Sequence, residues 1–264
     1  MLLLALGLLA APQAGPAYAA LLARGDEAFT SRADPARLAE AIEAFGRAAT
    51  LHPGGAEAEI RLARAEAFRA IAEPGAAREA WVASSRAAER ALRKISPEWG
   101  AAVDAGDLVG APGRVGPEGA EALYWLALAT WSSAQSKGLA ALLAVKDPAL
   151  AAMERAAALD GAIDCAGPHR ALGAWTAALP AAVGGGVARS RRHFDETRAS
   201  GAACLLNRVR EAESLLVLLQ DRVAFERMLS DVEGSADSDP RWAPENAVAR
   251  RLARDLRGRA TRLF

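Results

Sequence analysis

The sequence has few aromatic residues and no excess of either charge. Phe, Trp and Tyr make up only 5% of the 264 residues, although hydrophobic residues reach 52%. Much of that content is alanine, which is the best helix former but buries little area, so the composition favours closely packed helices over a sheet. The 32 basic side chains balance the 32 acidic ones. The basic excess typical of nucleic-acid-binding proteins is therefore absent, and we expect no nucleic-acid partner.

Residues suited to catalysis or metal binding are also scarce, with three histidines and two cysteines in the chain. Cys165 and His169 stand four residues apart, but a cysteine nucleophile would need that histidine in hydrogen-bond reach and a third group to orient it. A second candidate set, matching no standard metal-ligand spacing, comprises Asp164, His169, His193 and Asp195. We expect a surface position for His193, and a protein that is not an enzyme and takes no metal or cofactor.

No hydrophobic run is long enough to cross a membrane, which takes about 20 residues. The apolar stretch Leu2–Ala11 instead fits the core of a signal peptide, although no basic residue precedes it. Ala17, Tyr18 and Ala19 form an A-x-A cleavage pattern. We predict a signal peptide over residues 1–19 and a periplasmic location; the alternative is a buried N-terminal helix. No cysteine follows the apolar core, so we expect no lipid attachment there.

The chain has no segment with the period-two alternation of a half-buried strand. Glycine and proline instead separate segments with helical patterns. These predicted helices cover residues 21–29, 35–51, 57–72, 76–95, 120–137, 138–145, 148–159, 169–179, 187–199, 204–219, 223–232 and 244–264. Asp34-Pro35 and Asp147-Pro148 each supply an N-cap and a first helical residue. Residues 96–119, rich in glycine and proline, are predicted to be a long loop with a helical turn near Trp99, inside one all-helical domain over residues 20–264.

Three glycines, Gly184, Gly185 and Gly186, stand together in a chain otherwise dense in alanine. Because each glycine lowers helix stability by about 1 kcal/mol relative to alanine, they predict a turn between two helices of a hairpin. A phosphate-binding loop would need a lysine and a serine or threonine after the glycines. Val187 and Ala188 stand there instead, which excludes that motif.

Two predicted second helices of hairpins share a spacing of four, three and five residues. The two sets are Ala41, Phe45, Ala48, Pro53 and Ser190, Phe194, Thr197, Ala202. This spacing is typical of the second helix of a tetratricopeptide repeat. We therefore predict an all-α fold of stacked antiparallel helical hairpins, a compact tetratricopeptide-like solenoid.

The two cysteines, Cys165 and Cys204, are predicted to lie at the starts of helices in successive hairpins. An even cysteine count in an exported chain favours a disulfide, which needs Cα atoms within about 7 Å. Two buried free thiols are the alternative.

Large apolar side chains are concentrated in a few tryptophans of the predicted hairpins. Trp125, Trp131 and Trp175 supply much of the large apolar area of this alanine-rich chain. The three tryptophans could be buried in the core, or one or more of them could line a groove that binds a ligand or a partner.

A series of segments resembles the T-component family associated with TRAP transporters, TatT. The segments are ALYWLALATW, LAAMERAAALDG, HRALGAWTAALP and GGG followed by ARSRRHF, and later Asp221 with Phe225, Asn246 with Ala249, and Leu263-Phe264. The resemblance covers residues 120–264 well and residues 20–95 loosely. The chain departs from the family in lacking its lipid-modified cysteine and in having Gly186 and Ser190 where an acidic residue and an alanine are common.

This resemblance implies a homotrimeric, non-enzymatic accessory that docks a periplasmic TRAP-type solute-binding protein. It also implies that the protein binds or channels a ligand, with apolar compounds among the candidates. The three tryptophans and the segment 96–119 are the candidate docking surface. From the residues alone, a general tetratricopeptide-type scaffold for envelope assembly remains the alternative.

Overall fold

The computed structural model describes residues 15–264, and the predicted signal-peptide core at residues 2–11 lies outside them. The described residues fold into helices joined by short turns and contain no strand. The all-α prediction is therefore confirmed.

The helices follow one another as antiparallel neighbours. They are α1 (Pro16–Thr30), α2 (Pro35–Leu51), α3 (Glu57–Ala72), α4 (Ala77–Ile95), α5 (Pro97–Asp104), α6 (Ala120–Lys137), α7 (Leu139–Leu159), α8 (Ile163–Ala178), α9 (Val187–Ser200), α10 (Leu205–Glu211), α11 (Arg222–Gly234), α12 (Ala243–Gly258) and α13 (Ala260–Leu263). Each of α1 with α2, α3 with α4, α6 with α7 and α8 with α9 packs extensively as a hairpin, and α4 packs against α6 as closely as α1 does against α2, so four connected hairpins precede the C-terminal helices.

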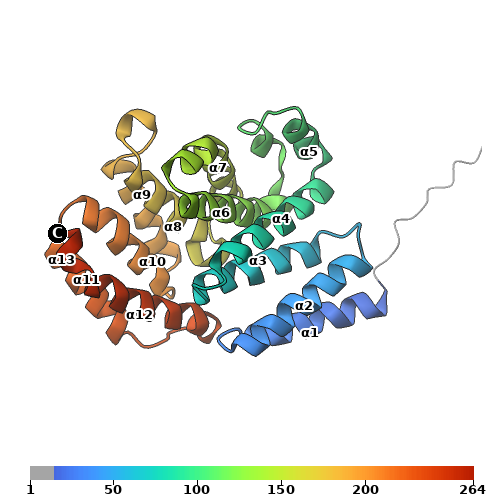
Figure 1. The fold of residues 1–264 in the computed structure, drawn as a ribbon, viewed down its shortest axis with the longest axis horizontal. Helices are drawn as coiled ribbons and strands as arrows, with labels where there is room; N and C mark the ends of the chain where they lie inside the picture. Colours follow the sequence, from blue (N-terminus) through green and yellow to red (C-terminus); the bar gives the residue numbers. More distant parts are fainter. Residues whose placement is uncertain (1–14) are drawn as a thin grey trace, which may run out of the picture.

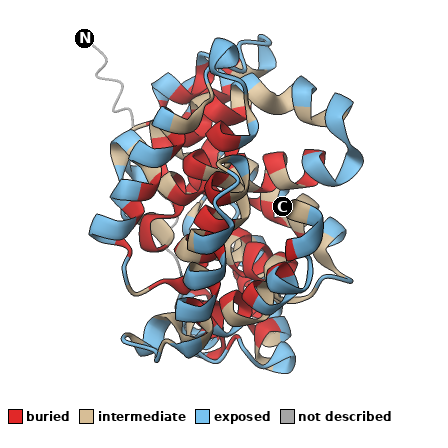
Figure 2. Cartoon of the chain, turned by 90° about the vertical axis from the view of Figure 1, so that its left-hand side faces the viewer, coloured by how far each residue is buried: buried red, intermediate tan, exposed pale blue. Residues whose placement is uncertain are grey.

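The chain curves so that its last long helix returns to its first hairpin (Figure 1). Val248 of α12 joins the apolar cluster formed by α1, α2 and α3, and Arg251 donates a hydrogen bond to the Ile71 carbonyl. Buried residues line the inner faces of the helices, and exposed residues cover the outside (Figure 2). The hairpins therefore surround an interior to which both ends of the chain contribute.

The hairpins pack through buried residues spaced at four and three along each second helix, and in three of the four helices a large residue stands between two small ones. The four sets are Ala41, Phe45, Ala48; Ser84, Ala88, Ala91; Ala149, Met153, Ala156; and Ser190, Phe194, Thr197, none more than 3% exposed. In two hairpins, moreover, the serine of the second helix donates a hydrogen bond of 2.8 Å to a first-helix carbonyl, that of Ala63 or Gly173. Two of the four sets are those that the sequence spacing singled out.

The three consecutive glycines lie in the tight connection between α8 and α9. Gly184 and Gly186 have φ of 86° and 105°, a conformation that favours glycine. At Gly185 a Cβ atom would lie 2.0 Å from the Leu179 carbonyl oxygen, and Gly186 donates its N–H to the Thr176 carbonyl at 2.8 Å. The reversal of the chain therefore requires glycine here, because of positive φ at Gly184 and Gly186 and because of the lack of space for a Cβ atom at Gly185.

The glycine- and proline-rich segment 96–119 contains α5 and two short 3₁₀ turns at Ala111–Arg114 and Pro117–Gly119. The Ser96 hydroxyl caps α5 by accepting the Trp99 N–H. Trp99 is buried with the core around α4 and α6. The two ends of the segment are thus packed against the hairpins, whereas residues 104–110 between them are exposed.

Several helix boundaries differ from those predicted; α8, for example, begins at Ile163 and not at His169. α7 runs unbroken through Pro148, where the sequence predicted the start of a separate helix. The missing N–H of Pro148 leaves free the Ala144 carbonyl, which lies on an exposed stretch of the helix where water can bond it. α1 begins at Pro16 and not near Leu21, so Ala17 and Ala19 lie inside it.

Candidate functional site

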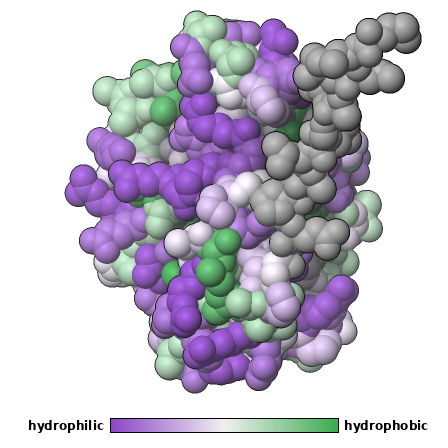
Figure 3. All heavy atoms as spheres, turned by 90° about the vertical axis from the view of Figure 1, so that its right-hand side faces the viewer, coloured by the Kyte–Doolittle hydropathy of each residue, from purple (hydrophilic) through white to green (hydrophobic). Residues whose placement is uncertain are grey.

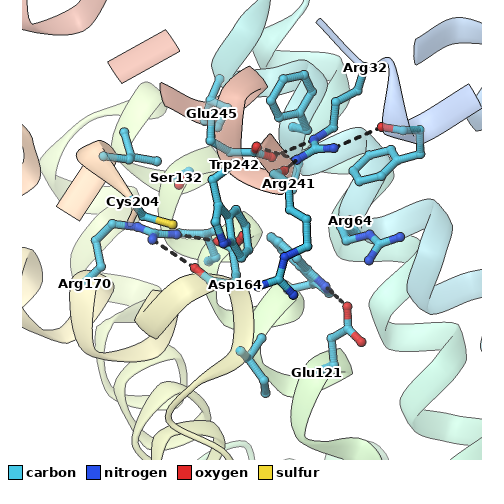
Figure 4. Close-up of a pocket in the computed structure, with 18 of the residues that line it drawn as sticks. Arg32, Arg64, Glu121, Ser132, Asp164, Arg170, Cys204, Arg241, Trp242 and Glu245 are labelled. Atoms are coloured by element: carbon cyan, nitrogen blue, oxygen red, sulfur yellow. Dashed lines mark hydrogen bonds and ion pairs between the residues drawn. The ribbon is translucent and has the colours of Figure 1, made fainter. Parts of the chain in front are cut away.

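A pocket of about 640 Å³ lies inside the ring of hairpins, between α1, α3, α4, α6, α8, α10 and the start of α12 (Figure 4). Its apolar wall consists of Phe29, Phe68, Ile71, Trp81, Trp125, Leu128, Ile163, Leu206 and Trp242. Its charged side chains are Asp26, Arg32, Arg64, Glu121, Asp160, Asp164, Arg170, Arg210, Arg241 and Glu245. The volume and the apolar wall are typical of small-molecule sites, although this lining carries more charged side chains than such sites usually have.

Helical spacing brings the wall residues together. On α6 the lining residues Glu121, Trp125, Leu128 and Ser132 follow one another at four, three and four residues, so they share one face of the helix. On α3 a similar stripe runs from Arg64 through Phe68 to Ile71. The two stripes carry apolar side chains together with one carboxylate and one guanidinium.

The N- and C-terminal parts of the chain meet at one buried ion pair above the pocket. Arg32, in the turn after α1, donates from Nε to Glu245 Oε1 at 2.8 Å and from Nη2 to Glu245 Oε2 at 2.5 Å. It also bonds the carbonyls of Phe29 and Arg241. Burial raises the pKa of Glu245, and the Arg32 guanidinium opposes that shift. The bond to Phe29 is local, whereas those to Glu245 and Arg241 join segments more than 200 residues apart in the sequence.

On another wall, a second buried network fixes the start of α8. The Asp164 carboxylate accepts a hydrogen bond from the Tyr124 hydroxyl at 2.6 Å and pairs with Arg170, which donates to Asn207 Oδ1 at 2.9 Å. Burial, followed by the charge of Asp164, raises the pKa of Tyr124 well above its usual range. The phenol therefore stays protonated and acts as a hydrogen-bond donor.

This network holds an unusual stretch of backbone. Asp164, Cys165 and Ala166 have φ of 49°, 57° and 62°, three successive non-glycine residues in the left-handed region. Each such residue costs about 1–2 kcal/mol. The Asn207 amide donates to the Cys165 carbonyl at 3.1 Å, and a disulfide joins Cys165 to Cys204 with the Cα atoms 6.3 Å apart. The surrounding bonds therefore maintain a conformation that this local sequence would not adopt alone.

Arg64 on α3 differs from the other pocket arginines in its contacts. Its guanidinium carbon lies 4.5 Å above the Phe29 ring, and its nearest carboxylate oxygen, on Asp26, is 3.9 Å away. Its buried Nε has no hydrogen-bond partner among the described residues. Burial lowers the pKa of Arg64, against the attraction of Glu121 and Asp26. Figure 4 shows Arg64 and Glu121 on one side of the pocket and Asp164 and Arg170 on the other.

The three tryptophans singled out from the sequence lie in two different places. Trp125 lines the pocket and donates its indole N–H to Glu121 at 3.0 Å. Trp131 and Trp175 stack with ring centroids 4.3 Å apart, buried in the central core and away from the residues that line the pocket. The three side chains do not form a single groove.

The histidines and acidic residues considered for a metal site are not gathered around one point. His169 and His193 face each other, with 3.2 Å between their Nδ1 atoms, so His193 is half-buried and not the surface residue that the sequence predicted. Asp195 pairs with Arg198, and Asp164 bonds Tyr124 and Arg170. Within residues 15–264 no group of three or more potential metal ligands is present. The sulfur of Cys165 is held in the disulfide.

The sequence did not reveal the charged residues of the pocket. Arg32 lies in a turn and Glu245 in the first turn of a helix more than 200 residues later, and no local pattern connects them. The stripe on α6 was the one accessible indication, because Glu121 precedes Trp125 by one helical turn on a face that also carries Leu128.

The structure thus defines an all-helical protein whose hairpins enclose a pocket with apolar walls and several charged groups. Residues 57–264 match the family model of the TRAP transporter T-component, and the chain belongs to this family. The resemblance noted in the sequence is thereby confirmed, and the protein is a component of a TRAP-type transport system. The matched region begins with the first residue of α3, so α1 and α2 lie outside it.

No curated protein matches the chain. Among residues 15–264, no helix has both the length and the apolar character needed to span a bilayer.

Proposed function

We propose that this protein is a non-enzymatic periplasmic accessory of a TRAP-type transport system, which docks a solute-binding protein and holds or channels a ligand. Family membership supports the transport role. The observation that carries the ligand role is the pocket of about 640 Å³ enclosed by the hairpins. Its lining of apolar and charged side chains suits a small molecule that has both an apolar part and polar groups.

Export to the periplasm is part of this proposal. The apolar segment and the A-x-A pattern support it, and the Cys165–Cys204 disulfide suits an oxidising compartment. Cleavage after Ala19 would remove Tyr18, which is buried against His52 at a ring-centroid distance of 5.1 Å. N-terminal sequencing of the protein from an envelope fraction tests this step, and recovery of an intact Met1 in the cytosol would contradict it.

The docking surface is proposed to lie on exposed apolar residues, because the net charge of zero provides no strong attracting field. The face in Figure 3 mixes hydrophilic and hydrophobic residues in small groups. Among the exposed apolar residues, Leu139 and Leu143 at the start of α7 are 71% and 54% exposed, and Leu108 and Val109 in segment 96–119 are also exposed. We propose these residues in place of the buried Trp131 and Trp175.

We further propose a homo-oligomer, a trimer in keeping with the family resemblance, with tetratricopeptide-like hairpins as its framework. The buried spacing of four and three residues on four second helices, with a large middle residue in three of them, supports that framework. Arrays of helical hairpins bury their own cores and leave long curved faces available for other proteins.

Co-purification of the tagged full-length chain from envelope extract tests the docking proposal. The wild type should recover a solute-binding protein, and a Leu139→Glu/Leu143→Glu variant should lose it. Val223→Glu is a matched control, because Val223 is 80% exposed on α11. If the wild type recovers no solute-binding protein and sediments only as a monomer at micromolar concentration, the general-scaffold function is favoured instead.

A further inference from the structure

We propose that Arg64 is the head-group site of the pocket and that the pocket takes an amphipathic monoanion, a molecule with one anionic head and an apolar body. This inference rests on the proposed function, because it assumes that the pocket holds a ligand. It adds the chemical class of that ligand and the residue that recognises its charge.

The first argument is the pairing of the pocket arginines. The four others are each bonded to a carboxylate, in the pairs Arg32–Glu245, Arg170–Asp164, Arg210–Glu213 and Arg241–Asp239. For Arg64 the nearest carboxylate oxygen, on Asp26, is at 3.9 Å, beyond hydrogen-bond distance. Asp26 itself accepts two hydrogen bonds from Arg61 Nε, at 2.9 and 3.1 Å. Within residues 15–264, Arg64 is thus the pocket arginine without a bonded carboxylate.

The second argument is the cost of leaving that guanidinium as it is. Among the donors of Arg64, Nε is buried and has no hydrogen-bond partner within the described structure, whereas the side chain as a whole is 36% exposed and water can reach its other donors. The side chain lies against the Phe29 ring, which favours the cation but accepts no hydrogen bond. A carboxylate or phosphate oxygen in the pocket would supply the missing acceptors in short, charge-assisted bonds.

The third argument concerns the rest of the ligand. Phe68 and Ile71 continue from Arg64 along the same face of α3, and Trp81, Trp125 and Leu128 also line the pocket. An apolar body attached to the anionic head would therefore contact mainly aromatic and aliphatic side chains and remove their surface from water.

The remaining carboxylates limit the ligand to one negative charge. Glu121 and Asp160 also line the pocket, and neither forms an ion pair within the described residues. Each already accepts a hydrogen bond, Glu121 from the Trp125 indole and Asp160 from the Ala162 N–H. These hydrogen bonds already stabilise the two carboxylates, so they do not require a cation on the ligand. Both carboxylates would, however, repel a second anionic group on the ligand.

Isothermal titration calorimetry of the full-length chain tests this proposal with four probes. They are decanoate, decyl phosphate, decyltrimethylammonium and succinate. We expect one or both decyl anions to bind at least ten times more tightly than the decyl cation, and succinate to bind more weakly than either. The ratio of the two anions identifies the preferred head group, carboxylate or phosphate.

Two single-residue variants test whether Arg64 binds the anionic head group of the ligand. Arg64→Gln should weaken binding of the preferred anion at least tenfold, while Arg86→Gln, which removes the same charge from an exposed position on α4, should change it less than twofold. Thermal unfolding checks that both variants fold. If Arg64→Gln does not fold, Arg64→Lys replaces it and should lose at least threefold, because a lysine lacks the planar pair of donors.

Three results would overturn the inference. They are equal binding of the decyl anion and the decyl cation, full anion affinity in the folded Arg64 variant, and no binding of any probe to the wild type. The third result would also remove the ligand from the proposed function. The co-purification experiment decides the docking of a solute-binding protein separately, so the two proposals do not fail together.

Discussion

At the scale of single residues, two hairpins are built around a glycine that makes room for a phenylalanine ring. A Cβ atom on Gly25 would lie 2.4 Å from Cε1 of Phe45, and one on Gly173 would lie 2.9 Å from the Phe194 ring. Both rings are completely buried. Because protein interiors are close-packed, these glycines determine how closely the two helices of each hairpin approach.

Gly25→Ala should therefore destabilise the protein, by about 1–3 kcal/mol in the free energy of unfolding, since the added methyl group forces the Phe45 ring to move. The measurement is urea unfolding monitored by circular dichroism. Gly46→Ala is the matched control, because Gly46 lies on α2 with no atom within 4 Å of its Cβ position. That variant should be up to about 1 kcal/mol more stable. Equal effects at the two positions would contradict this account of the packing.

At the scale of elements, the start of α8 carries more constraints than any other helix end described above. Three left-handed residues, a disulfide and a buried network of Tyr124, Asp164 and Arg170 meet there. Strained backbone of this kind persists only where its surroundings determine it. Because Asp164 and Cys204 line the pocket, these constraints also set the shape of the ligand site.

Removal of the disulfide should lower stability without changing the fold. Cys165 and Cys204 are 39 positions apart in the sequence, and closing a loop of that length in the unfolded chain corresponds to about 2–4 kcal/mol. We expect this loss for a Cys165→Ala/Cys204→Ala variant compared with the oxidised wild type, and the same loss for wild type under reducing conditions. A double variant as stable as the oxidised wild type would show that the bridge contributes nothing.

The contact between α8 and α9 should make stability depend on pH. Burial, followed by the charges of His169, Arg189 and Arg192, lowers the pKa of His193 to about 4, and burial lowers that of His169 although Glu196 opposes it. The folded state thus prefers both rings neutral, whereas in the unfolded chain they take up protons below pH 6.5. Stability is therefore complete above pH 6.5 and falls as the pH decreases toward 4.

Thermal unfolding between pH 7.5 and 4.5 measures this effect. The melting temperature of the wild type should fall with pH, and that of His193→Gln should fall less, because one of the two protonation sites is missing. Glu196 and the neighbouring arginines stay in place in this variant. The same decrease in both proteins would show that carboxylates elsewhere are responsible.

The sequence predicted the hairpins better than the pocket, for a physical reason. Phe45 and Phe194 lie within a few residues of the small residues that form the pattern with them. The same residues pack the two helices of each hairpin together, so the hairpins can be recognised from the local sequence. The prediction that a new helix starts at Pro148 was wrong, since α7 continues through this residue. The Asp-Pro pair looks the same in the local sequence whether the proline lies at the start of a helix or inside one. The pocket depends on contacts such as Arg32–Glu245, whose partners are 213 residues apart and leave no periodic trace.

At the scale of the whole molecule, one buried ion pair joins the two ends of the ring. The hairpin of α1 and α2 lies outside the region matched by the family model, but it supplies Phe29 and Arg32 to the pocket. Apart from the apolar contacts of Val248 and Leu252, its connection to α12 depends on Arg32 and Glu245, whose side chains are 8% and 11% exposed. Ring closure and pocket formation therefore depend on the same side chains.

Replacing Arg32 should open this junction. Arg32→Ala leaves the Glu245 carboxylate buried without its cation, a change that typically costs about 3–5 kcal/mol. We expect a loss of that order in urea unfolding, with faster amide hydrogen exchange in α1, α2 and α12 and little change in α6 and α7. Arg24→Ala is the control, since Arg24 forms an exposed pair with Glu40 on the outside of the same hairpin, and it should leave both measurements unchanged.

A second variant separates the loss of the ion pair from the burial of an unpaired charge. Arg32→Met/Glu245→Leu removes both charges, so it should recover much of the stability lost in Arg32→Ala, because well-packed apolar groups replace a buried pair at little cost. It should not restore the hydrogen bonds that Arg32 donates to the carbonyls of Phe29 and Arg241. Slow exchange in α12 of Arg32→Ala would contradict the assigned role, because the ring would then close through apolar contacts alone.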